Sequence, residues 1–422
     1  MAIARTVREA LVSSSMIRKL FEEGRELKKK YGGDRVFDFS IGNPDLEPPP
    51  AFHRVLKSLA GKDAEGKTPG SHGYMPNAGY PEVREILAQK ASREQGCTVP
   101  ASHIIMSVGA AGGLNVVFKS ILDPGDEVIV SRPFFMEYRP YTANHGGILV
   151  EAPGGRDFGL DLAAIEQALS PKTAAVLINS PHNPTGRVYP AGDIAALADL
   201  LRRWEKKSGR RPWLVADEPY REIVYGGLTV PPVLSAYEES IAVTSYSKSL
   251  SLPGERIGYI ALSPAAEDAE TVLGALIYAT RVLGYVNAPA LMQRVVAALT
   301  EERVDVETYA RRRAAFMDVL DSAGMTYVKP EGAFYIFAQV PSPGAGTDTA
   351  KAAPDGLQPS SGDRAFSELL KKHLVLGVPG SSFGAPGWIR FAYCVDEGVI
   401  RASAPALRET MDEWRRPSRP HP

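Results

Sequence analysis

The middle of the chain alternates short, continuous apolar runs with segments of helical periodicity. The apolar runs predict strands at residues 104–108, 127–130, 174–179, 213–216, 241–244 and 257–262. Several of these runs are apolar at nearly every position, as expected for strands covered on both faces. Helical patterns lie between them, such as 114–122, after a glycine-rich turn, and 194–207. This alternation predicts an α/β fold with a mainly parallel sheet flanked by helices.

The pattern changes after about residue 288. A long helical pattern runs to about residue 324, and strand-like runs at 334–340 and 388–393 flank a helix near 364–372. This mixture predicts a smaller α+β domain. An amphipathic helix is expected at 15–31, ended by Gly32 and Gly33.

We therefore divide the chain into an N-terminal arm that joins the smaller domain (1–45), a large domain (46–290) and a smaller C-terminal domain (291–422). Residues 341–362 are rich in Pro, Gly, Ala and Ser and predict a mobile surface insertion. The tail at 415–422 is expected to fray.

Composition narrows the function classes. The net charge of −1 gives no general attraction to nucleic acid or to an anionic membrane. No apolar run is long enough to span a membrane. The only two cysteines, Cys97 and Cys394, are far apart, so a reducing compartment is the default. Acidic residues in the first helix argue against a transit peptide. These features predict a cytoplasmic enzyme or binding protein, and no metal site is predicted.

Lys248 is the most informative single residue. It follows a predicted strand, lies in the run Ser-Tyr-Ser-Lys-Ser at 245–249, and is the only lysine between Lys207 and Lys329. A desolvated amine can lose its proton and attack a carbonyl to form a Schiff base. The surrounding hydroxyls and Arg256, eight positions on, suggest a carbonyl compound with a phosphate. Pyridoxal 5'-phosphate has both groups. The alternative is a chance lysine in a serine-rich loop.

Two loops after predicted strands add weaker signals. The run Gly-Ala-Ala-Gly-Gly at 109–113 would expose backbone N–H groups at a helix start, which suits a phosphate, although a tight packing turn is an equal alternative. Its spacing fits neither the dinucleotide fingerprint nor the P-loop. In the run Ser-Pro-His-Asn-Pro-Thr-Gly at 180–186, Asn183 can donate to a ligand oxygen at a strand end. An ordinary Asn-Pro turn is the alternative.

Two charged residues interrupt apolar strands. Asp217 ends the run Trp-Leu-Val-Ala at 213–216, and a buried carboxylate there needs a cationic partner such as a pyridinium nitrogen or an arginine. Glu218 competes for this role, and Tyr220 either contacts the cofactor or packs. Arg390 lies in the run Trp-Ile-Arg-Phe at 388–391. Its fork fits a substrate carboxylate, with a structural salt bridge as the alternative.

In this order, the Asn-Pro-Thr-Gly, Asp-x-x-Tyr and Ser-x-Ser-Lys motifs and the late arginine resemble the class I/II aminotransferases of PLP fold type I, over about residues 12–409. The resemblance implies that Lys248 holds the cofactor and shuttles the proton, that Asp217 pairs with the ring nitrogen, and that Asn183 and Tyr220 donate to the phenolic oxygen. Many relatives stack Trp or Tyr on the ring. Here Phe135 is assigned to the stack, with Phe134 adjacent.

The resemblance also implies a phosphate cup, a substrate clamp and a second subunit. Many relatives have a hydroxyl residue in the glycine turn, so here its phosphate contacts must come from the backbone. The phosphate cup comprises Ser245, Ser247, Arg256 and the backbone of Gly109, Ala110 and Ala111. Arg390 clamps the α-carboxylate with the backbone of Gly42. Tyr74 resembles the tyrosine that reaches the partner subunit's phosphate, which implies a homodimer with shared active sites.

The implied reaction moves the amino group of an L-α-amino acid to a 2-oxo acid. An aspartate/glutamate-type enzyme with 2-oxoglutarate is favoured, and it needs a second cation, for which Arg281 and Arg18 are candidates. Each is otherwise a surface arginine. The alternatives are aromatic, alanine or methionine specificity, a PLP β- or γ-lyase, an aminotransferase-like regulator domain, and an NAD-dependent oxidoreductase. The regulator domain is disfavoured because no DNA-binding segment is evident.

Overall fold

A computed structural model describes residues 3–4, 7–8, 16–67, 70–342 and 362–416 of the chain, without the side chains of residues 16–19 and 21. Most of the predicted insertion (343–361) and the end of the predicted tail (417–422) lie outside the described residues. In the described part, no helix is long and apolar enough to cross a membrane.

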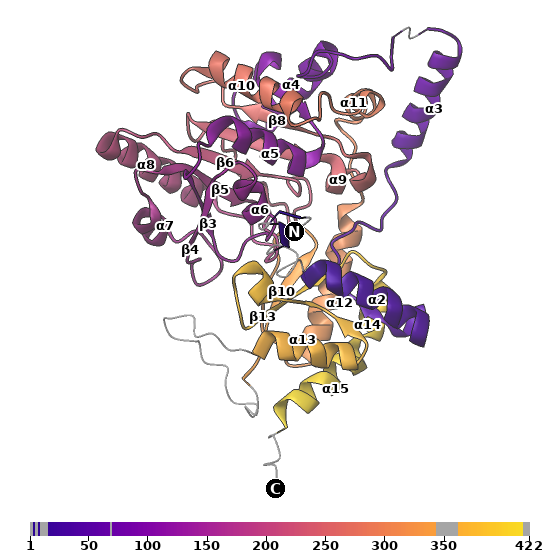
Figure 1. Ribbon diagram of the computed structural model, residues 1–422. Helices are drawn as coiled ribbons and strands as arrows, with labels where there is room; N and C mark the ends of the chain where they lie inside the picture. The colour runs from indigo at the N-terminus through magenta and orange to yellow at the C-terminus, as the bar shows by residue number, and fades with distance from the viewer. Residues whose placement is uncertain (1–2, 5–6, 9–15, 68–69, 343–361, 417–422) are drawn as a thin grey trace.

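A seven-stranded sheet forms the upper part of the molecule in Figure 1. Four strand pairs are parallel, and only the strand at 258–262 runs antiparallel to its two neighbours. The predicted mainly parallel sheet is therefore confirmed. In spatial order the strands are β2 (Ile104–Ser107), β8 (Gly258–Leu262), β7 (Ser240–Ser245), β6 (Trp213–Asp217), β5 (Thr173–Asn179), β3 (Glu127–Ser131) and β4 (Ile148–Ala152).

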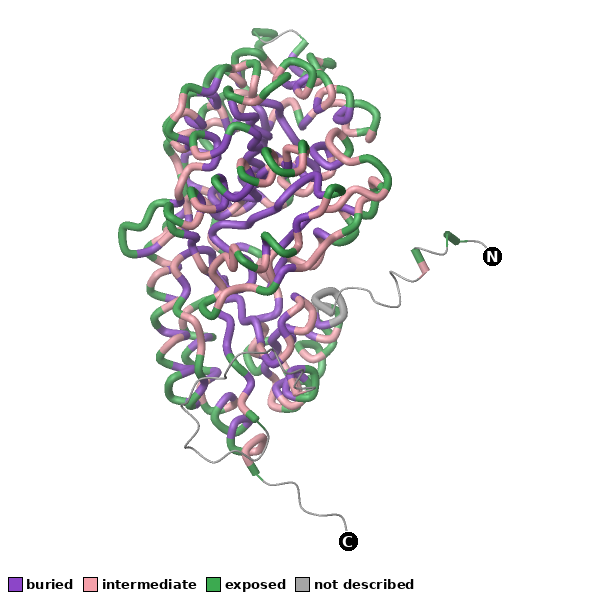
Figure 2. The backbone as a smooth tube through the Cα atoms, turned by 90° about the vertical axis from the view of Figure 1, so that its left-hand side faces the viewer, coloured by how far each residue is buried: buried purple, intermediate pink, exposed green. Residues whose placement is uncertain are grey.

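Helices cover both faces of this sheet, which explains the continuous apolar runs. Successive residues of one strand pack in different cores. Val176 and Ile178 of β5 face one core, whereas Ala175 and Leu177 face the other. Figure 2 shows the buried residues concentrated in these central strands. The first core contains residues of α3 (Pro50–Ala64), α4 (Pro81–Gln95), α7 (Leu162–Ala168), α8 (Ala191–Ser208) and α11 (Ala290–Ala297). The second contains residues of α5 (Gly109–Ile121), α6 (Tyr138–Ala143) and α10 (Ala269–Val282).

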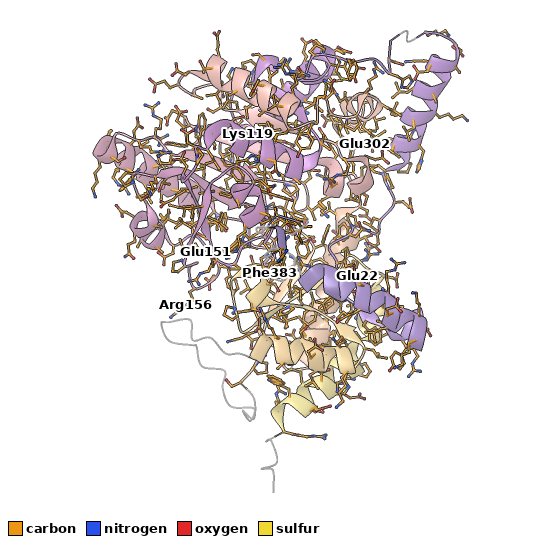
Figure 3. All side chains as sticks on the ribbon, in the orientation of Figure 1. Glu22, Lys119, Glu151, Arg156, Glu302 and Phe383 are labelled. Carbon is orange, nitrogen blue, oxygen red and sulfur yellow. The ribbon has the colours of Figure 1, made fainter. Side chains whose placement is uncertain are left out.

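The lower part of the molecule contains a smaller sheet and a separate core rich in phenylalanine. Its antiparallel strands are β12 (Val378–Pro379), β13 (Trp388–Ala392), β10 (Tyr335–Gln339) and β9 (Tyr327–Val328). Its helices are α2 (Met16–Tyr31), α12 (Val306–Ser322), α13 (Gly362–Lys372), α14 (Glu397–Ala402) and α15 (Ala404–Arg415). In Figure 3, Phe383 lies near the junction of the two parts. The backbone carbonyl of Phe383 accepts a hydrogen bond from Phe134 there.

The N-terminal segment joins the lower part. Strand β1 (Phe37–Asp38) pairs in parallel with β11 (Val375–Leu376), and the N–H of Ala392 donates to the carbonyl of Phe39. The loop that follows, residues 40–46, is therefore fixed beside β13. The domain limits at residues 45 and 290 stay a prediction.

Two predicted elements were wrong in detail. The helical pattern at 288–324 is two helices, α11 and α12, separated by residues 298–305; Asp305 caps the second by accepting from the N–H groups of Glu307 and Thr308. The glycine-rich run is not a turn before a helix but the first turn of α5 itself. Gly113 is needed for packing, because an added Cβ would lie 2.7 Å from Cγ1 of Val243.

Candidate active site

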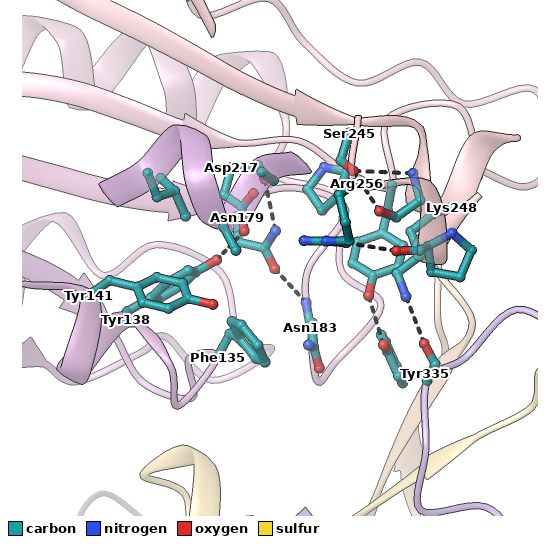
Figure 4. A pocket seen from close by; sticks show the side chains of 18 of the residues that line it. Phe135, Tyr138, Tyr141, Asn179, Asn183, Asp217, Ser245, Lys248, Arg256 and Tyr335 are labelled. Carbon is teal, nitrogen blue, oxygen red and sulfur yellow. Dashed lines mark hydrogen bonds between the residues drawn. The ribbon is translucent and has the colours of Figure 1, made fainter. Parts of the chain in front are cut away.

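A cavity of about 300 Å³ lies at the carboxyl ends of β5, β6 and β7, beside the loop at 40–46 (Figure 4). In Figure 4, Phe135, Tyr138 and Tyr141 lie on one side, and Lys248 and Tyr335 on the other. The lining combines backbone from α5 with aromatic, amide, carboxylate and cationic side chains. Its residues are Gly42, Ala110, Ala111, Leu114, Phe135, Tyr138, Tyr141, Asn179, Asn183, Asp217, Pro219, Tyr220, Ser245, Ser247, Lys248, Pro253, Arg256, Tyr335 and Arg390.

Lys248 lies in the short helix α9 (Tyr246–Ser249), directly after β7. Its Nζ donates a 2.7 Å hydrogen bond to the carbonyl of Gly42, which belongs to the N-terminal segment. Burial lowers the pKa of the amine to about 8, and the positive charges of Arg390 and Arg256 add to this against an opposing effect of Cys394. The fold therefore supplies what the sequence predicted, an amine that is readily neutral near physiological pH.

This pKa predicts how the protein without cofactor takes up pyridoxal 5'-phosphate. Only the neutral amine attacks the aldehyde, so covalent capture should slow about tenfold for each pH unit below about 7 and level off above about 8. Stopped-flow absorbance measures the rate. Pyridoxine 5'-phosphate, which lacks the aldehyde, controls for the pH dependence of phosphate binding. A covalent rate that follows the control at every pH would contradict the prediction.

Asp217 ends β6 and is buried, with 6% of its surface exposed. Its Oδ2 accepts a 2.6 Å hydrogen bond from Tyr138, whereas its Oδ1 is buried without a partner in the described structure. Burial raises the pKa of this carboxyl to about 7, although the Tyr138 hydrogen bond opposes the shift and the charge of Glu218 adds to it. A carboxylate left half-satisfied against a cavity is prepared for a cationic ligand.

The competing carboxylate, Glu218, does not line the cavity. It forms an ion pair of 2.8 Å with Arg221 and accepts a 2.9 Å hydrogen bond from Gln95. The arginine partner that was considered for Asp217 thus belongs to its neighbour, because successive residues at the end of the strand face opposite sides.

The amide Asn183 lies between the lower part and the strand ends. Its Oδ1 accepts from Nη1 of Arg390 at 3.1 Å, and its backbone N–H donates to Asn179 at 2.7 Å. Asn179 in turn donates to the carbonyl of Asp217 at 2.8 Å. The parallel register places Asn179 directly beside Asp217. One chain of hydrogen bonds therefore links Arg390 to the strand that carries the buried carboxylate.

Arg390 is almost fully buried at 2% exposure, and no carboxylate pairs with it within the described ranges. Its Nη2 donates to the carbonyl of Ser40 at 2.7 Å, and its Nε has no partner. The guanidinium carbon lies 4.6 Å from the centroid of the Tyr335 ring and 4.9 Å from that of the Phe383 ring. A buried cation with free donor capacity favours an anionic ligand over the alternative of a structural salt bridge.

The opposite end of the cavity has the features of a phosphate site. The first N–H groups of α5, including those of Ala110 and Ala111, have no acceptor within the helix. The hydroxyls of Ser245 and Ser247 are 2.7 Å apart, and Arg256 lies against Gly109, where an added Cβ would be 2.9 Å from its Nη2. Gly109 itself has a φ of 68°, which disfavours other residues. These groups together can bind a dianion.

The structure predicts a strong effect of changing Gly42. An added Cβ would lie 2.6 Å from Cζ of Tyr335 and closer still to its hydroxyl. Gly42→Ala should therefore displace Tyr335 and the loop that accepts from Lys248, and lower kcat/KM at least about 100-fold. Steady-state kinetics measures the effect. Gly61→Ala is the control, since no atom lies within 4 Å of a Cβ added there. Activity within threefold of the parent would contradict the prediction.

Three predicted site residues, Gly109, Tyr74 and Arg281, are not among the residues that line the cavity within one chain. Tyr74 is 94% exposed on a loop, and Arg281 is exposed near the end of α10. The side chain of Arg18 lies outside the described residues. Of the two adjacent phenylalanines, Phe135 lines the cavity whereas Phe134 is buried in the core beneath it.

Sequence reasoning missed four residues with polar side chains that line the cavity. Asn179 and Tyr138 were recognisable in principle, because Asn179 ends a predicted strand and Tyr138 closes the segment around Phe135. Tyr141 follows one helical turn later. Tyr335 lies in an apolar strand of the lower part, where nothing in the pattern separates it from a core residue.

The residues present fit pyridoxal 5'-phosphate. The partnerless Oδ1 of Asp217 suits a protonated ring nitrogen, the start of α5 with Arg256 suits the phosphate, and Lys248 suits the aldehyde. The aromatic wall at Phe135 suits the flat ring. The cavity is within the size range of small-ligand sites.

Comparisons with known proteins agree with this arrangement. The family model "Aminotransferase class I and II" matches residues 34–407. The probable aspartate/prephenate aminotransferase of Aquifex aeolicus is 32% identical, over 93% of this chain and 94% of its own. A crystal structure of an amino transferase from Eubacterium rectale is 35% identical with a TM-score of 0.90, covering 99% of this chain and 100% of that one. Thermus thermophilus aspartate aminotransferase with maleate gives a TM-score of 0.80 at 28% identity, covering 97% of this chain and 100% of that one.

Proposed function

Because the chain belongs to the class I and II aminotransferases, we propose that it transfers the amino group of aspartate or glutamate to a 2-oxo acid such as 2-oxoglutarate. It is a pyridoxal 5'-phosphate-dependent transaminase of fold type I. Relatives named aspartate/prephenate and aspartate aminotransferases support the substrate class. A β- or γ-lyase is not favoured by these relatives.

One observation carries the proposal: a single cavity holds a buried amine of lowered pKa, a buried carboxylate oxygen without a partner, and a buried arginine without a carboxylate among the residues described. Each group alone is costly to bury. Together they match the aldehyde and ring nitrogen of the cofactor and the α-carboxylate of an amino acid.

The residues divide the work as follows. When bound, pyridoxal 5'-phosphate supplies an aldehyde that exchanges amino groups and a ring that accepts electrons from the substrate's α-carbon. Arg390 binds and orients the α-carboxylate, so that the α-hydrogen faces Lys248. Nζ of Lys248 removes that proton and returns it, and an amine with a pKa of about 8 suits this exchange. Asp217 keeps a proton at the ring nitrogen.

The substrate test is a panel of amino donors assayed against 2-oxoglutarate with the loaded protein. Conversion of the cofactor's absorption from the aldehyde form to the amine form reports the first half-reaction for each donor separately. Aspartate and glutamate should give the highest kcat/KM. Aromatic donors that exceed both would overturn the proposed specificity. Pyruvate or ammonia released without any 2-oxo acid would indicate a lyase.

The same panel of amino donors tests the role of Arg390 through the variant Arg390→Lys. Lysine keeps the charge but loses the two-pronged contact, so KM should rise about 10- to 100-fold for all donors alike. The uniform rise follows because every α-amino acid has the same carboxylate. Arg408→Lys, on the surface of α15, is the control. A rise confined to aspartate and glutamate would instead place Arg390 at the substrate's side chain.

We further propose a homodimer with shared active sites and a cytoplasmic location. Support for the dimer comes from Tyr74, whose ring is almost wholly exposed, and from exposed apolar residues on α10, Tyr278 and Val282. Sedimentation gives the subunit number. Mixing inactive Lys248→Ala subunits with Tyr74→Phe subunits tests whether the active sites are shared. In a hybrid dimer, one site should combine Lys248 of one subunit with Tyr74 of the other and regain activity. Cell fractionation tests the location.

A further inference from the structure

Tyr335 contacts three parts of the site at once. It begins β10, and its side chain is 3% exposed and lines the cavity. Its hydroxyl oxygen lies 2.7 Å from that of Tyr220, and its ring lies 4.6 Å from the guanidinium of Arg390. The same hydroxyl fills the space above Gly42, which accepts from Lys248. The side chain therefore lies between the groups proposed for the substrate and for the cofactor.

The direction of the hydrogen bond between the two tyrosines follows from counting protons. Each hydroxyl has one hydrogen to donate and can also accept. Tyr220 must use its hydrogen for the cofactor's phenolic oxygen, if the proposed function is right. Tyr335 is then left as the donor to Tyr220. Donation from Tyr335 polarises the Tyr220 hydroxyl and strengthens its own donation.

The surroundings of the two tyrosines keep both hydroxyls protonated. Burial raises the pKa of Tyr335 to about 12, while the charge of Arg390 opposes the rise. Burial raises the pKa of Tyr220 further, and Tyr335 itself adds to that rise. Both hydroxyls therefore stay protonated near neutral pH, and each has one hydrogen to donate.

We propose that Tyr335 is a positioning residue of the transamination reaction with two separable roles, one for its hydroxyl and one for its ring. The hydroxyl donates to Tyr220 and thereby tunes the cofactor's phenolic oxygen. The ring contacts the Arg390 guanidinium, which Phe383 also contacts, and restricts its position. This inference rests on the proposed function.

The hydroxyl is tested without substrate, by the pH midpoint of the absorption change of the loaded protein. A weaker hydrogen-bond donor to the phenolic oxygen leaves more negative charge on that oxygen. The adjacent proton that titrates is then held more firmly, so the pH midpoint of the absorption change rises. Tyr220→Phe should raise it most, and Tyr335→Phe should raise it by about 0.5 to 1 unit. In the double variant, Tyr335→Phe should add nothing to Tyr220→Phe, because its path to the cofactor is gone.

A second buried tyrosine pair provides the matched control. The hydroxyl of Tyr393 donates to that of Tyr225 at 3.2 Å, and neither residue lines the cavity. Tyr393→Phe removes a comparable buried hydroxyl and should leave the midpoint unchanged. If Tyr335→Phe does not yield folded protein, 3-fluorotyrosine at position 335 replaces it. Fluorine makes the hydroxyl more acidic and should move the midpoint downward.

The ring is tested by the kinetics of amino donors. Tyr335→Phe keeps the aromatic face and should leave KM within about twofold of the parent. Tyr335→Leu removes it and should raise KM about 30-fold, the size of a desolvated cation–π contact. Equal KM values for the two variants would overturn the role of the ring.

The outcomes separate this inference from the proposed function. A midpoint that moves in Tyr220→Phe but not in Tyr335→Phe overturns the role of the Tyr335 hydroxyl and leaves the function intact. A further shift in the double variant shows that Tyr335 acts without Tyr220, which also overturns it. If the parent protein does not bind the cofactor, the proposed function itself fails.

Discussion

Replacing Lys248 with alanine should lower transamination at least about 10⁴-fold, the upper range for loss of a general acid–base group. The expectation follows from its position, because among the described residues Lys248 is the only lysine that lines the cavity. The nearby cations are the guanidinium groups of Arg256 and Arg390, which do not release protons near neutral pH. Single-turnover absorbance with aspartate measures the loss.

The variant should still bind pyridoxal 5'-phosphate, because the start of α5, Ser245 and Arg256 are untouched. Reduction with borohydride should label the parent protein at the peptide containing Lys248 and should leave the variant unlabelled. Lys206→Ala, an exposed lysine of α8, is the matched control and should be fully active. Turnover of Lys248→Ala within tenfold of the parent would exclude this lysine as the proton carrier.

Replacing Asp217 with asparagine should lower kcat about 10²- to 10⁴-fold without weakening the fold. The loss corresponds to about 3–5 kcal/mol for removing one partner of a buried charge pair, here the carboxylate opposite the ring nitrogen. The asparagine oxygen can still accept from Tyr138, so the packing around the site should persist.

Asp217→Asn should lower activity, but it should raise the stability of the protein without cofactor. Burial raises the pKa of Asp217 to about 7 in the protein without cofactor, well above its value of 3.8 in an unfolded chain. A raised carboxyl pKa costs stability above the unfolded value, and the cost grows until the folded group also ionises. Asp217→Asn should therefore be more stable than the cofactor-free parent, by a margin that grows from about pH 4 to about pH 7 and is then constant.

Thermal unfolding of the cofactor-free proteins across this pH range measures the margin. Glu218→Gln is the comparison, because Glu218 is equally buried but paired with Arg221. Burial raises the pKa of Glu218 too, but Glu218→Gln leaves the buried Arg221 guanidinium without its carboxylate, so we expect this variant to lose stability and to keep kcat within a few-fold. If Glu218→Gln lost activity like Asp217→Asn, the assignment of the ring partner would be wrong.

The sequence predicted the parts of the site that depend on strand ends. Asn183, Asp217 and Lys248 each follow an apolar strand, and parallel strands bring their carboxyl ends to one edge of a sheet. Their positions at strand ends and the family resemblance together put them in one predicted site. The sequence pattern was wrong for the glycines at 109–113, which were predicted to form a turn. They are the start of α5, where Gly113 packs closely against Val243 of the sheet.

The sequence by itself determined the mainly parallel sheet, the order of its motifs and the chemical type of each principal group, because strand burial and motif spacing are properties of the local chain. Only the tertiary structure decided which carboxylate faces the cavity, that Gly42 lies against Tyr335 and Lys248, and that Tyr335 links Tyr220 to Arg390. Those contacts join residues more than 50 positions apart in the chain. Their distances and burial, which set the pKa values, exist only once the two sheets pack together.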